Sequence, residues 1–271
     1  MKPFLFKIIA LIFFSIFTTQ LSAQKFQGKA YYFSKSKMEL GNWGARMSEA
    51  QKKQMQNRLK DRLEKKYILN FNMQESTFLE EDKIDAISGA TDSWGGYFSR
   101  GDLHKNIKEN KLVQSQEFYG KRFLVKDKLV NIEWNLGTET KKIGNYTCYK
   151  AAAMVPKSEL NWFDFSWNDL RQNSDETKKI EETMIVIEAW YTPQIPVAQG
   201  PAEYWGLPGL ILEVSAGNTT LLCSEIILNP KEKVTITAPD KGENITKKGY
   251  TSNIRKKMVE MRNNRMGRRS R

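Results

Sequence analysis

Few residues of this sequence have a type and spacing that would support catalysis or metal binding. Its single histidine, His104, lies in the charged stretch GDLHKNIKEN and is expected at the surface. The sequence has no cluster of His, Cys and acidic residues with metal-site spacing, and no nucleotide-binding or nucleophile-elbow motif. We therefore expect neither a metal nor another cofactor.

Paired carboxylates are the one catalytic arrangement that the sequence leaves open. A glycosidase needs two acids, one on each side of the bond that it cleaves. Asp164 with Asp169, and Glu181 with Glu182, would be such pairs. Pairs of this kind arise by chance in any charged loop. A secreted hydrolase is therefore the second hypothesis, behind a protein that is not an enzyme.

The two cysteines, Cys148 and Cys223, lie in apolar runs typical of strands. An even and minimal number of cysteines in an exported chain favours a disulfide bond. The alternative is that each cysteine is a small buried hydrophobic residue. We expect the bridge, which requires the two strands that carry these residues to lie close together in the sheet.

Residues 1–23 have the three parts of a cleavable export signal. Lys2 and Lys7 are followed by the apolar run IIALIFFSIF and then by Leu-Ser-Ala. The apolar run is too short to cross a bilayer comfortably. We expect cleavage before Gln24 and a mature protein in the periplasm, at the outer membrane or outside the cell.

The positive charge of the chain is concentrated at its C-terminus. The net charge is +12, of which residues 247–271 contribute +9 and the signal +2. The rest of the chain is nearly neutral, so it forms no basic domain, and a nucleic-acid partner is not expected. The tail is expected to be solvated and helix-prone, with weak contact to anionic lipid headgroups or acidic glycans.

Residues 24–246 predict a single domain built mainly from short strands. One amphipathic helix is expected at residues 48–66, because Ser48 and Gln51 form a capping box and Met55, Leu59 and Leu63 recur every fourth residue. Residues 161–182 form an aromatic insertion. The fold class is mainly β (α+β), a curved antiparallel sheet or half-barrel with the helix against one face. The expected strands are residues 25–33, 67–71, 76–79, 118–125, 128–134, 146–154, 183–191, 210–215, 219–228 and 233–238.

The most distinctive segment is a proline-rich connection between two of these strands, within residues 189–214. Proline fixes φ and lacks an N–H donor, so the connection is stiff and cannot pair as a central strand. Pro208 and Gly209 fit the central positions of a type II turn, with Gly209 at positive φ. Entry into a buried strand gives no reason for four prolines, so we expect an exposed recognition surface here. Its candidate binding residues are Trp190, Tyr191, Pro193, Pro196, Tyr204 and Trp205.

The end of this connection spells GLPGLI, with the residues Gly206, Leu207, Pro208, Gly209, Leu210 and Ile211. With the flanking runs KKIGNYTCYKA, AWYTPQIP and QGP, the chain resembles the GLPGLI family of exported Bacteroidota proteins. The resemblance extends over about residues 25–239 and implies export and a mainly β domain. It implies no activity, because the family has no established catalytic or binding residues.

The leading hypothesis is therefore a non-enzymatic envelope protein. It would carry an apolar ligand, or serve as an accessory to an outer-membrane partner protein. A curved sheet with a helix across its mouth is also the layout of periplasmic lipoprotein carriers, a likeness of fold alone. A concave apolar cavity would distinguish the carrier, and two facing carboxylates would distinguish the hydrolase.

Overall fold

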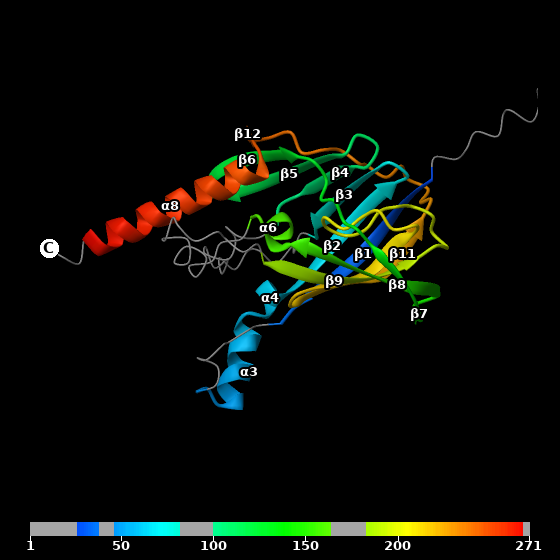
Figure 1. Cartoon of the computed structure of the whole chain (residues 1–271), viewed down its shortest axis with the longest axis horizontal. Helices are drawn as coiled ribbons and strands as arrows, with labels where there is room; N and C mark the ends of the chain where they lie inside the picture. Colours follow the sequence, from blue (N-terminus) through cyan, green and yellow to red (C-terminus); the bar gives the residue numbers. More distant parts are fainter. Residues whose placement is uncertain (1–25, 38–45, 82–99, 164–182, 268–271) are drawn as a thin grey trace, which may run out of the picture.

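The fold is a single large open sheet of twelve strands with few helices (Figure 1), seen in a computed structural model that describes residues 26–37, 46–81, 100–163 and 183–267. The strand order is β12-β6-β5-β4-β3-β2-β1-β11-β10-β9-β8-β7. The strands at the two ends, β12 and β7, do not pair with each other, so the sheet is not closed. All pairs are antiparallel except β12 with β6. The prediction of a mainly β fold is confirmed. The strands are β1 Gln27–Ser36, β2 Glu64–Asn72, β3 Glu75–Glu80, β4 Leu103–Asn106, β5 Lys111–Phe118, β6 Lys121–Asp127, β7 Asn135–Ile143, β8 Tyr146–Pro156, β9 Met184–Thr192, β10 Leu210–Ala216, β11 Thr219–Leu228 and β12 Glu243–Ile245.

Strand β1 joins the two halves of the sheet, because it pairs with β2 on one side and with β11 on the other. Its residues alternate in burial as the two-residue period of a strand requires. Gly28, Ala30, Tyr32 and Ser34 point into the protein, and the residues between them are partly exposed. The inward side chains contribute to the main core, which also contains residues of β2, β3, β9, β10 and β11.

Two segments predicted as strands, residues 128–134 and 233–238, are not strands. The first runs beside the connection between β9 and β10. There the indole N–H of Trp205 donates to the carbonyl oxygen of Val130 at 2.8 Å. The indole N–H of Trp134 donates to the backbone carbonyl oxygen of Trp205, also at 2.8 Å. In this segment the carbonyl oxygen of Val130 therefore accepts a hydrogen bond from a side chain and not from the backbone of a neighbouring strand.

The predicted helix at residues 48–66 is shorter than expected. The capping box of Ser48 and Gln51 is present, but α3 ends at Arg58 (Glu49–Arg58) and is followed by a short α4 (Lys60–Leu63). From Glu64 the chain continues as β2, where Tyr67 is buried. No side chain of α3 is buried, so this helix does not cover a face of the sheet. Sheet pairing of residues 64–72 overrides the four-residue repeat.

The basic tail was expected to be solvated, and for its first turns this is wrong. Residues Lys247–Gly267 form helix α8, and the side chains of Tyr250, Ile254 and Met258 are buried. Their spacing of four places them on one face of the helix. They form a second core with Phe118, Phe123, Val125, Trp162 and Phe163. Trp162 lies two residues after the end of the short helix α6 (Lys157–Leu160).

Several predictions fall on residues outside the described ranges. They are the export signal and most of the aromatic insertion. Among the described helices, none combines the length and apolar character that a membrane crossing requires.

Candidate functional site

The connection between β9 and β10, residues 193–209 (the β9–β10 loop), folds back over the inner face of the sheet. Ser76 of β3 donates from its hydroxyl group to the side-chain oxygen of Gln199 at 2.8 Å. At the end of the loop, the hydroxyl group of Tyr32 in β1 donates to the carbonyl oxygen of Ile211 at 2.5 Å. The loop is therefore fixed to strands that are more than 100 positions away in the sequence.

Two of the prolines shape the loop by closing three-residue turns. The N–H of Val197 donates to the carbonyl oxygen of Ile195 at 2.8 Å, with Pro196 between them. The N–H of Gly209 donates to the carbonyl oxygen of Leu207 at 2.8 Å, with Pro208 between them. The fixed φ of proline matches the central residue of an inverse γ-turn.

The turns divide the loop into an outer and an inner side. Pro193, Pro196 and Pro208 are exposed, whereas the residues on both sides of Pro196 and of Pro208 are buried. We call these three prolines the proline ridge. The buried apolar residues belong to the main core, together with side chains of β1, β2 and β3. They are Ile195, Val197, Ala202, Tyr204 and Leu207.

The predicted type II turn at Pro208 and Gly209 is wrong. Positive φ occurs at Gly206, at +92°, and Gly209 has ordinary φ. Gly209 is required for a different reason. A Cβ at this position would lie 2.2 Å from the carbonyl oxygen of Thr192 and 2.8 Å from the nitrogen of Pro193. Because both are backbone atoms, the clash cannot be relieved by moving a side chain.

A buried lysine, Lys105 of β4, holds the centre of the loop. Its amino group donates to the carbonyl oxygens of Gly200 at 2.7 Å and of Tyr204 at 2.9 Å. The residue is fully buried. Burial lowers the pKa of Lys105 to about 7, Glu203 opposes this shift, and Arg100 adds to it. A neutral amine has two N–H bonds, which matches the two carbonyl acceptors.

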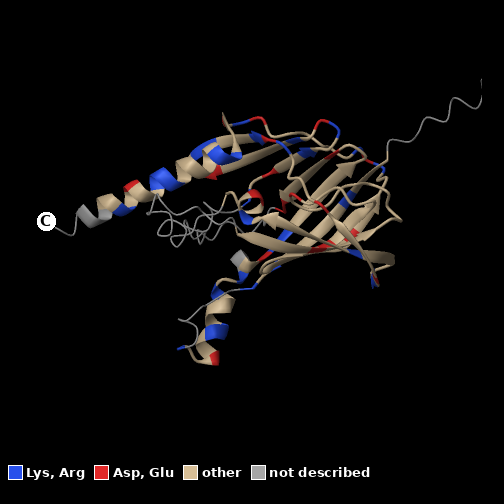
Figure 2. Ribbon diagram, in the orientation of Figure 1, with Lys and Arg blue, Asp and Glu red and all other residues tan. Residues whose placement is uncertain are grey.

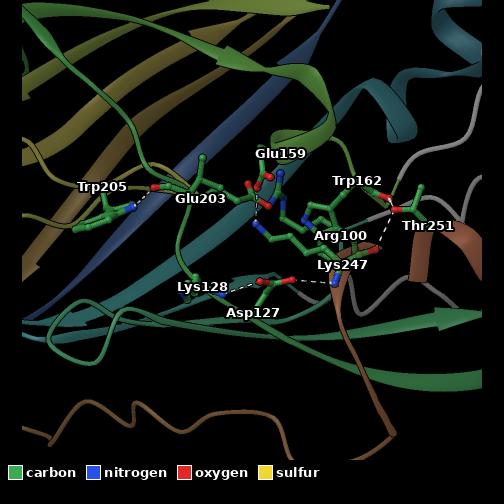
Figure 3. Close-up of polar contacts among 10 residues, drawn as sticks. Arg100, Asp127, Lys128, Glu159, Trp162, Glu203, Trp205, Lys247 and Thr251 are labelled. Carbon is green, nitrogen blue, oxygen red and sulfur yellow. Dashed lines mark hydrogen bonds and ion pairs between the residues drawn. The ribbon is translucent and has the colours of Figure 1, made fainter. Parts of the chain in front are cut away.

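Beside Lys105, Arg100 and Glu203 form an ion pair (Figure 3). The side chain of Glu203 is 1% exposed and that of Arg100 is 15% exposed. The guanidinium carbon of Arg100 also lies 5.0 Å from the centre of the Phe163 ring. Burial lowers the pKa of Arg100, but its charge interaction and hydrogen bond with Glu203 outweigh this effect and raise the pKa above its ordinary value. Arg100 therefore stays charged and neutralises the carboxylate.

Burial and neighbouring charges also affect two tyrosines at this cluster. The pKa of Tyr67 is raised to about 12, mainly by burial and then by the negative charge of Glu80. The pKa of Tyr204 is raised by burial and by Glu203. Both phenols are therefore neutral at any physiological pH. We refer to Arg100, Lys105 and Glu203 as the buried charged cluster.

The structure separates the predicted binding residues into exposed and buried groups. Pro193 and Pro196 are exposed as expected, while Tyr191 and Tyr204 are buried, contrary to the prediction. Tyr191 faces the core from β9, and the carbonyl oxygen of Tyr204 is held by Lys105. These two aromatic side chains therefore stabilise the fold.

The two predicted tryptophans are partly buried. The indole N–H of Trp205 is occupied by Val130, as described above. On the outer face of the sheet, the ammonium group of Lys141 lies 4.3 Å from the ring centre of Trp190 and 2.7 Å from the carboxylate of Glu213. Trp190 is therefore part of a packed surface layer with both charges.

The predicted disulfide bond is absent from the structure, in which Cys148 and Cys223 are free and buried. Cys148 lies in β8 and Cys223 in β11, with β9 and β10 between them. Neighbouring strands are about 4.8 Å apart, and a disulfide bond requires Cα atoms within about 7 Å. The two strands that carry the cysteines are therefore not neighbours in the sheet.

His104 was predicted at the surface but is buried in β4. Its Nε2 lies 3.6 Å from the carboxylate of Glu75. Burial lowers the pKa of His104, and Glu75 partly opposes this shift. The short strand β4 therefore carries two buried basic residues in a row, His104 and Lys105.

The described residues give no support for a metal site, and the acids proposed for a hydrolase are not among them. Within them, no three His, Cys, Asp or Glu side chains gather as metal ligands would. Of the described carboxylates Glu203 alone is buried, and Arg100 neutralises it. The acids proposed for a hydrolase, at positions 164, 169, 181 and 182, lie outside the described ranges.

The concave face that a carrier would need for an apolar ligand is filled by the β9–β10 loop. A separate shallow cavity of about 190 Å³ lies near β5 and β6, and polar side chains such as Gln116, Arg122 and Lys241 contribute to its wall. A drug-sized apolar ligand needs roughly 300 Å³ or more. The cavity therefore suits no ligand of that kind.

The comparisons with known proteins reach the same part of the chain. A family described as "Protein of unknown function (Porph_ging)" matches residues 134–213. This Porph_ging match includes Cys148, the β9–β10 loop and the GLPGLI residues, so it is compatible with the resemblance noted from the sequence. It supplies no activity, because the family is of unknown function.

Two solved structures of PNGF-II, in the C2 and P21 space groups, are distantly similar in fold. Their identities to the chain are 16% and 15%, and their TM-scores are 0.46 and 0.44. The matches include 84% and 81% of this chain, which spans about a third of the PNGF-II chain (32% and 31%). Among curated proteins, none shows significant similarity to the sequence.

Proposed function

We propose that this chain is an exported cell-envelope protein that binds a partner protein and does not catalyse a reaction. The observation that carries the proposal is the division of the β9–β10 loop. Its inner side is fixed by the main core and by Lys105, and its outer side presents the exposed proline ridge. This arrangement accounts for three of the four prolines, which a simple strand connection does not require, while the fourth, Pro201, is buried.

A rigid loop favours partner binding for a thermodynamic reason. Ordering a flexible segment on binding costs free energy, and a segment that is already fixed avoids most of that cost. Proline adds to the effect because it has few accessible conformations before binding. Exposed proline rings also present apolar area without a backbone N–H that must be desolvated.

The buried charged cluster supports a binding function over an enzymatic one. Lys105 is fully buried and both of its acceptors are backbone carbonyls, so a dissolved substrate cannot reach its amine. Arg100 and Glu203 neutralise each other. These charged groups are engaged in holding the loop, and none of the described contacts favours the hydrolase alternative.

Capture of envelope proteins on immobilised protein tests the proposal. The baits are the mature wild type, Pro193→Glu and the matched surface control Lys108→Glu. We expect one or a few proteins to be retained by the wild type and by the control, and to be depleted at least about tenfold with Pro193→Glu, since each 1.4 kcal/mol corresponds to a factor of ten. Equal retention by all three baits, with all three equally stable, would show that the ridge is not the binding surface.

Export is tested separately by the mass of the protein purified from its native host. The basic start, the apolar run and Leu-Ser-Ala predict a chain that begins at Gln24. A mass that includes residues 1–23 would rule out cleavage at this site.

A further inference from the structure

We propose that the outer face of helix α8 is a docking surface for membranes that carry anionic lipid headgroups. This inference goes beyond partner binding by the β9–β10 loop and concerns a different part of the molecule. It depends on how the helix is anchored, on how its cations are spaced, and on the direction in which it leaves the body.

The first turn of α8 is fixed to the body by polar contacts (Figure 3). The backbone N–H of Lys247 donates to the carboxylate of Asp127 at 3.1 Å, and its ammonium group lies 3.3 Å from the carboxylate of Glu159. The hydroxyl group of Thr251 donates to the carbonyl oxygen of Trp162 at 2.8 Å. A carboxylate at a helix N-terminus satisfies a free N–H and is favoured by the helix dipole.

The apolar face of the helix is occupied by the body. Tyr250, Ile254 and Met258 pack in the second core, and Met261 packs against its edge. The ring of Tyr250 meets those of Phe123 and Trp162 edge-on, with centroids 5.3 Å and 5.5 Å apart. The helix therefore cannot insert this face into a bilayer, and any membrane contact must be made by its charged side.

Beside this apolar face, the helix carries a regular row of cations. Lys248, Arg255 and Arg262 are seven residues apart, so they lie on one stripe of the helix at intervals of about 10 Å. None of the three is paired with a carboxylate elsewhere in the described part of the chain. Lys256 adds a further cation, and Lys257 lies 3.8 Å from Glu260, the only acid in the helix. We call Lys248, Arg255 and Arg262 the basic stripe.

The C-terminal end of the helix extends past the edge of the sheet (Figures 1 and 2). Figure 2 shows Lys and Arg repeated along it, whereas the sheet carries both signs of charge. A row of cations along one side of a straight helix can contact a flat surface at several points at once. An anionic bilayer is a flat surface of this kind, and each Lys or Arg near it is attracted by its surface potential.

Vesicle co-sedimentation of the mature full chain tests this proposal. The vesicles contain either phosphatidylcholine alone or phosphatidylcholine with 30% phosphatidylglycerol, a composition chosen for roughly physiological surface charge. The variants are the basic-stripe substitution Lys248→Gln/Arg255→Gln/Arg262→Gln and the matched control Lys108→Gln/Lys142→Gln/Lys231→Gln. The control removes the same charge from exposed lysines outside α8. Circular dichroism and a melting curve establish that both variants are folded.

We expect the wild type and the control to bind the anionic vesicles and not the neutral ones. The basic-stripe variant should bind at least about tenfold less, and raising the salt concentration should weaken all binding. Equal binding of the two triple variants would overturn the proposal, because net charge alone would then explain the effect. Absence of wild-type binding to anionic vesicles would also overturn it, and binding of an acidic polysaccharide or DNA instead would assign the stripe to a different partner.

Discussion

The amino group of Lys105 lies 2.7 Å from the carbonyl oxygen of Gly200, and this contact links β4 to the β9–β10 loop across 95 positions of the sequence. The same amine also holds the carbonyl oxygen of Tyr204. A fully buried lysine is costly, and it is tolerated here because two carbonyl groups receive its N–H bonds. Stability, pH dependence and loop rigidity should all depend on this contact.

Replacing Lys105 by Met tests the contact directly. The Met side chain is unbranched and one heavy atom shorter than Lys, and it leaves two buried carbonyl oxygens without their donor. Each unsatisfied group costs roughly 1–3 kcal/mol, so we expect the free energy of unfolding at pH 8.5 to fall by about 3 kcal/mol. Chemical denaturation measures it, and Lys108→Met on the surface should change it by less than about 0.5 kcal/mol. Equal effects of the two substitutions would contradict the role of Lys105.

The pH dependence of stability follows from the lowered pKa of Lys105. The pKa is about 7 in the folded protein and about 10.4 in an unfolded chain. Between these values the unfolded state binds more protons, so the free energy of unfolding contributed by this group falls as the pH decreases from about 10.4 to about 7 and levels off below 7. The stability difference between wild type and Lys105→Met should therefore be larger at pH 8.5 than at pH 6. A difference that does not change over this range would contradict the shifted pKa.

The ion pair of Arg100 and Glu203 is expected to show strong coupling. Glu203→Met leaves the guanidinium group without its partner, and losing one member of a buried pair costs about 3–5 kcal/mol. The double variant Arg100→Met/Glu203→Met should cost less than the sum of the two single substitutions, because no charge is then left unpaired. Denaturation of all four proteins provides the cycle. Additive effects would show that the two residues act independently.

The two glycines of the signature should respond differently to alanine. At Gly209 the new Cβ would collide with the backbone at Thr192, so Gly209→Ala should destabilise by about 3 kcal/mol. At Gly206 a Cβ would make only an ordinary contact, 3.8 Å from the indole nitrogen of Trp134, but φ is +92°, so Gly206→Ala should cost only about 1–2 kcal/mol. Melting temperatures of the two variants check the order. A lower melting temperature for Gly206→Ala than for Gly209→Ala would contradict the close backbone contact at Gly209.

The cysteines should behave as two free, protected thiols. Burial raises the pKa of Cys148 to about 11 and that of Cys223 to about 12. Because the thiolate is the reactive form, both should react slowly with a thiol reagent in the native protein at pH 8 and fully after denaturation without reductant. If exported protein that is denatured without reductant has no thiol that reacts with the reagent, the two cysteines form a disulfide bond and this prediction is wrong.

The sequence predicted the elements whose signals are local. The capping box at Ser48, the alternation in β1, and the strands around Cys148 and Cys223 all depend on neighbouring residues, and the structure contains them. The extent of the helix after Ser48 was overestimated, because pairing of β2 with β1 decides where the strand begins. That pairing is a contact between distant segments.

The candidate site could be predicted only in part. The prolines identified the β9–β10 loop, but the exposure of Tyr191 and Tyr204 depended on which way the loop folds. The buried charged cluster was missed because Lys and Arg in a polar stretch are normally exposed. One signal was available, since Lys105 follows Leu103 by two residues and therefore shares its inward face. Its partners lie about a hundred positions later in the chain and no local pattern indicates them.

The most direct measurement is site-specific photo-crosslinking in the intact cell envelope, with the photoreactive residue at position 193 on the proline ridge or at the exposed control position 108. A ridge that binds a partner protein predicts a discrete crosslinked product from position 193 that is absent from position 108. The product from position 193 should also decrease when Lys105→Met loosens the loop. No product from position 193, or the same products from both positions, would contradict a binding function for the loop.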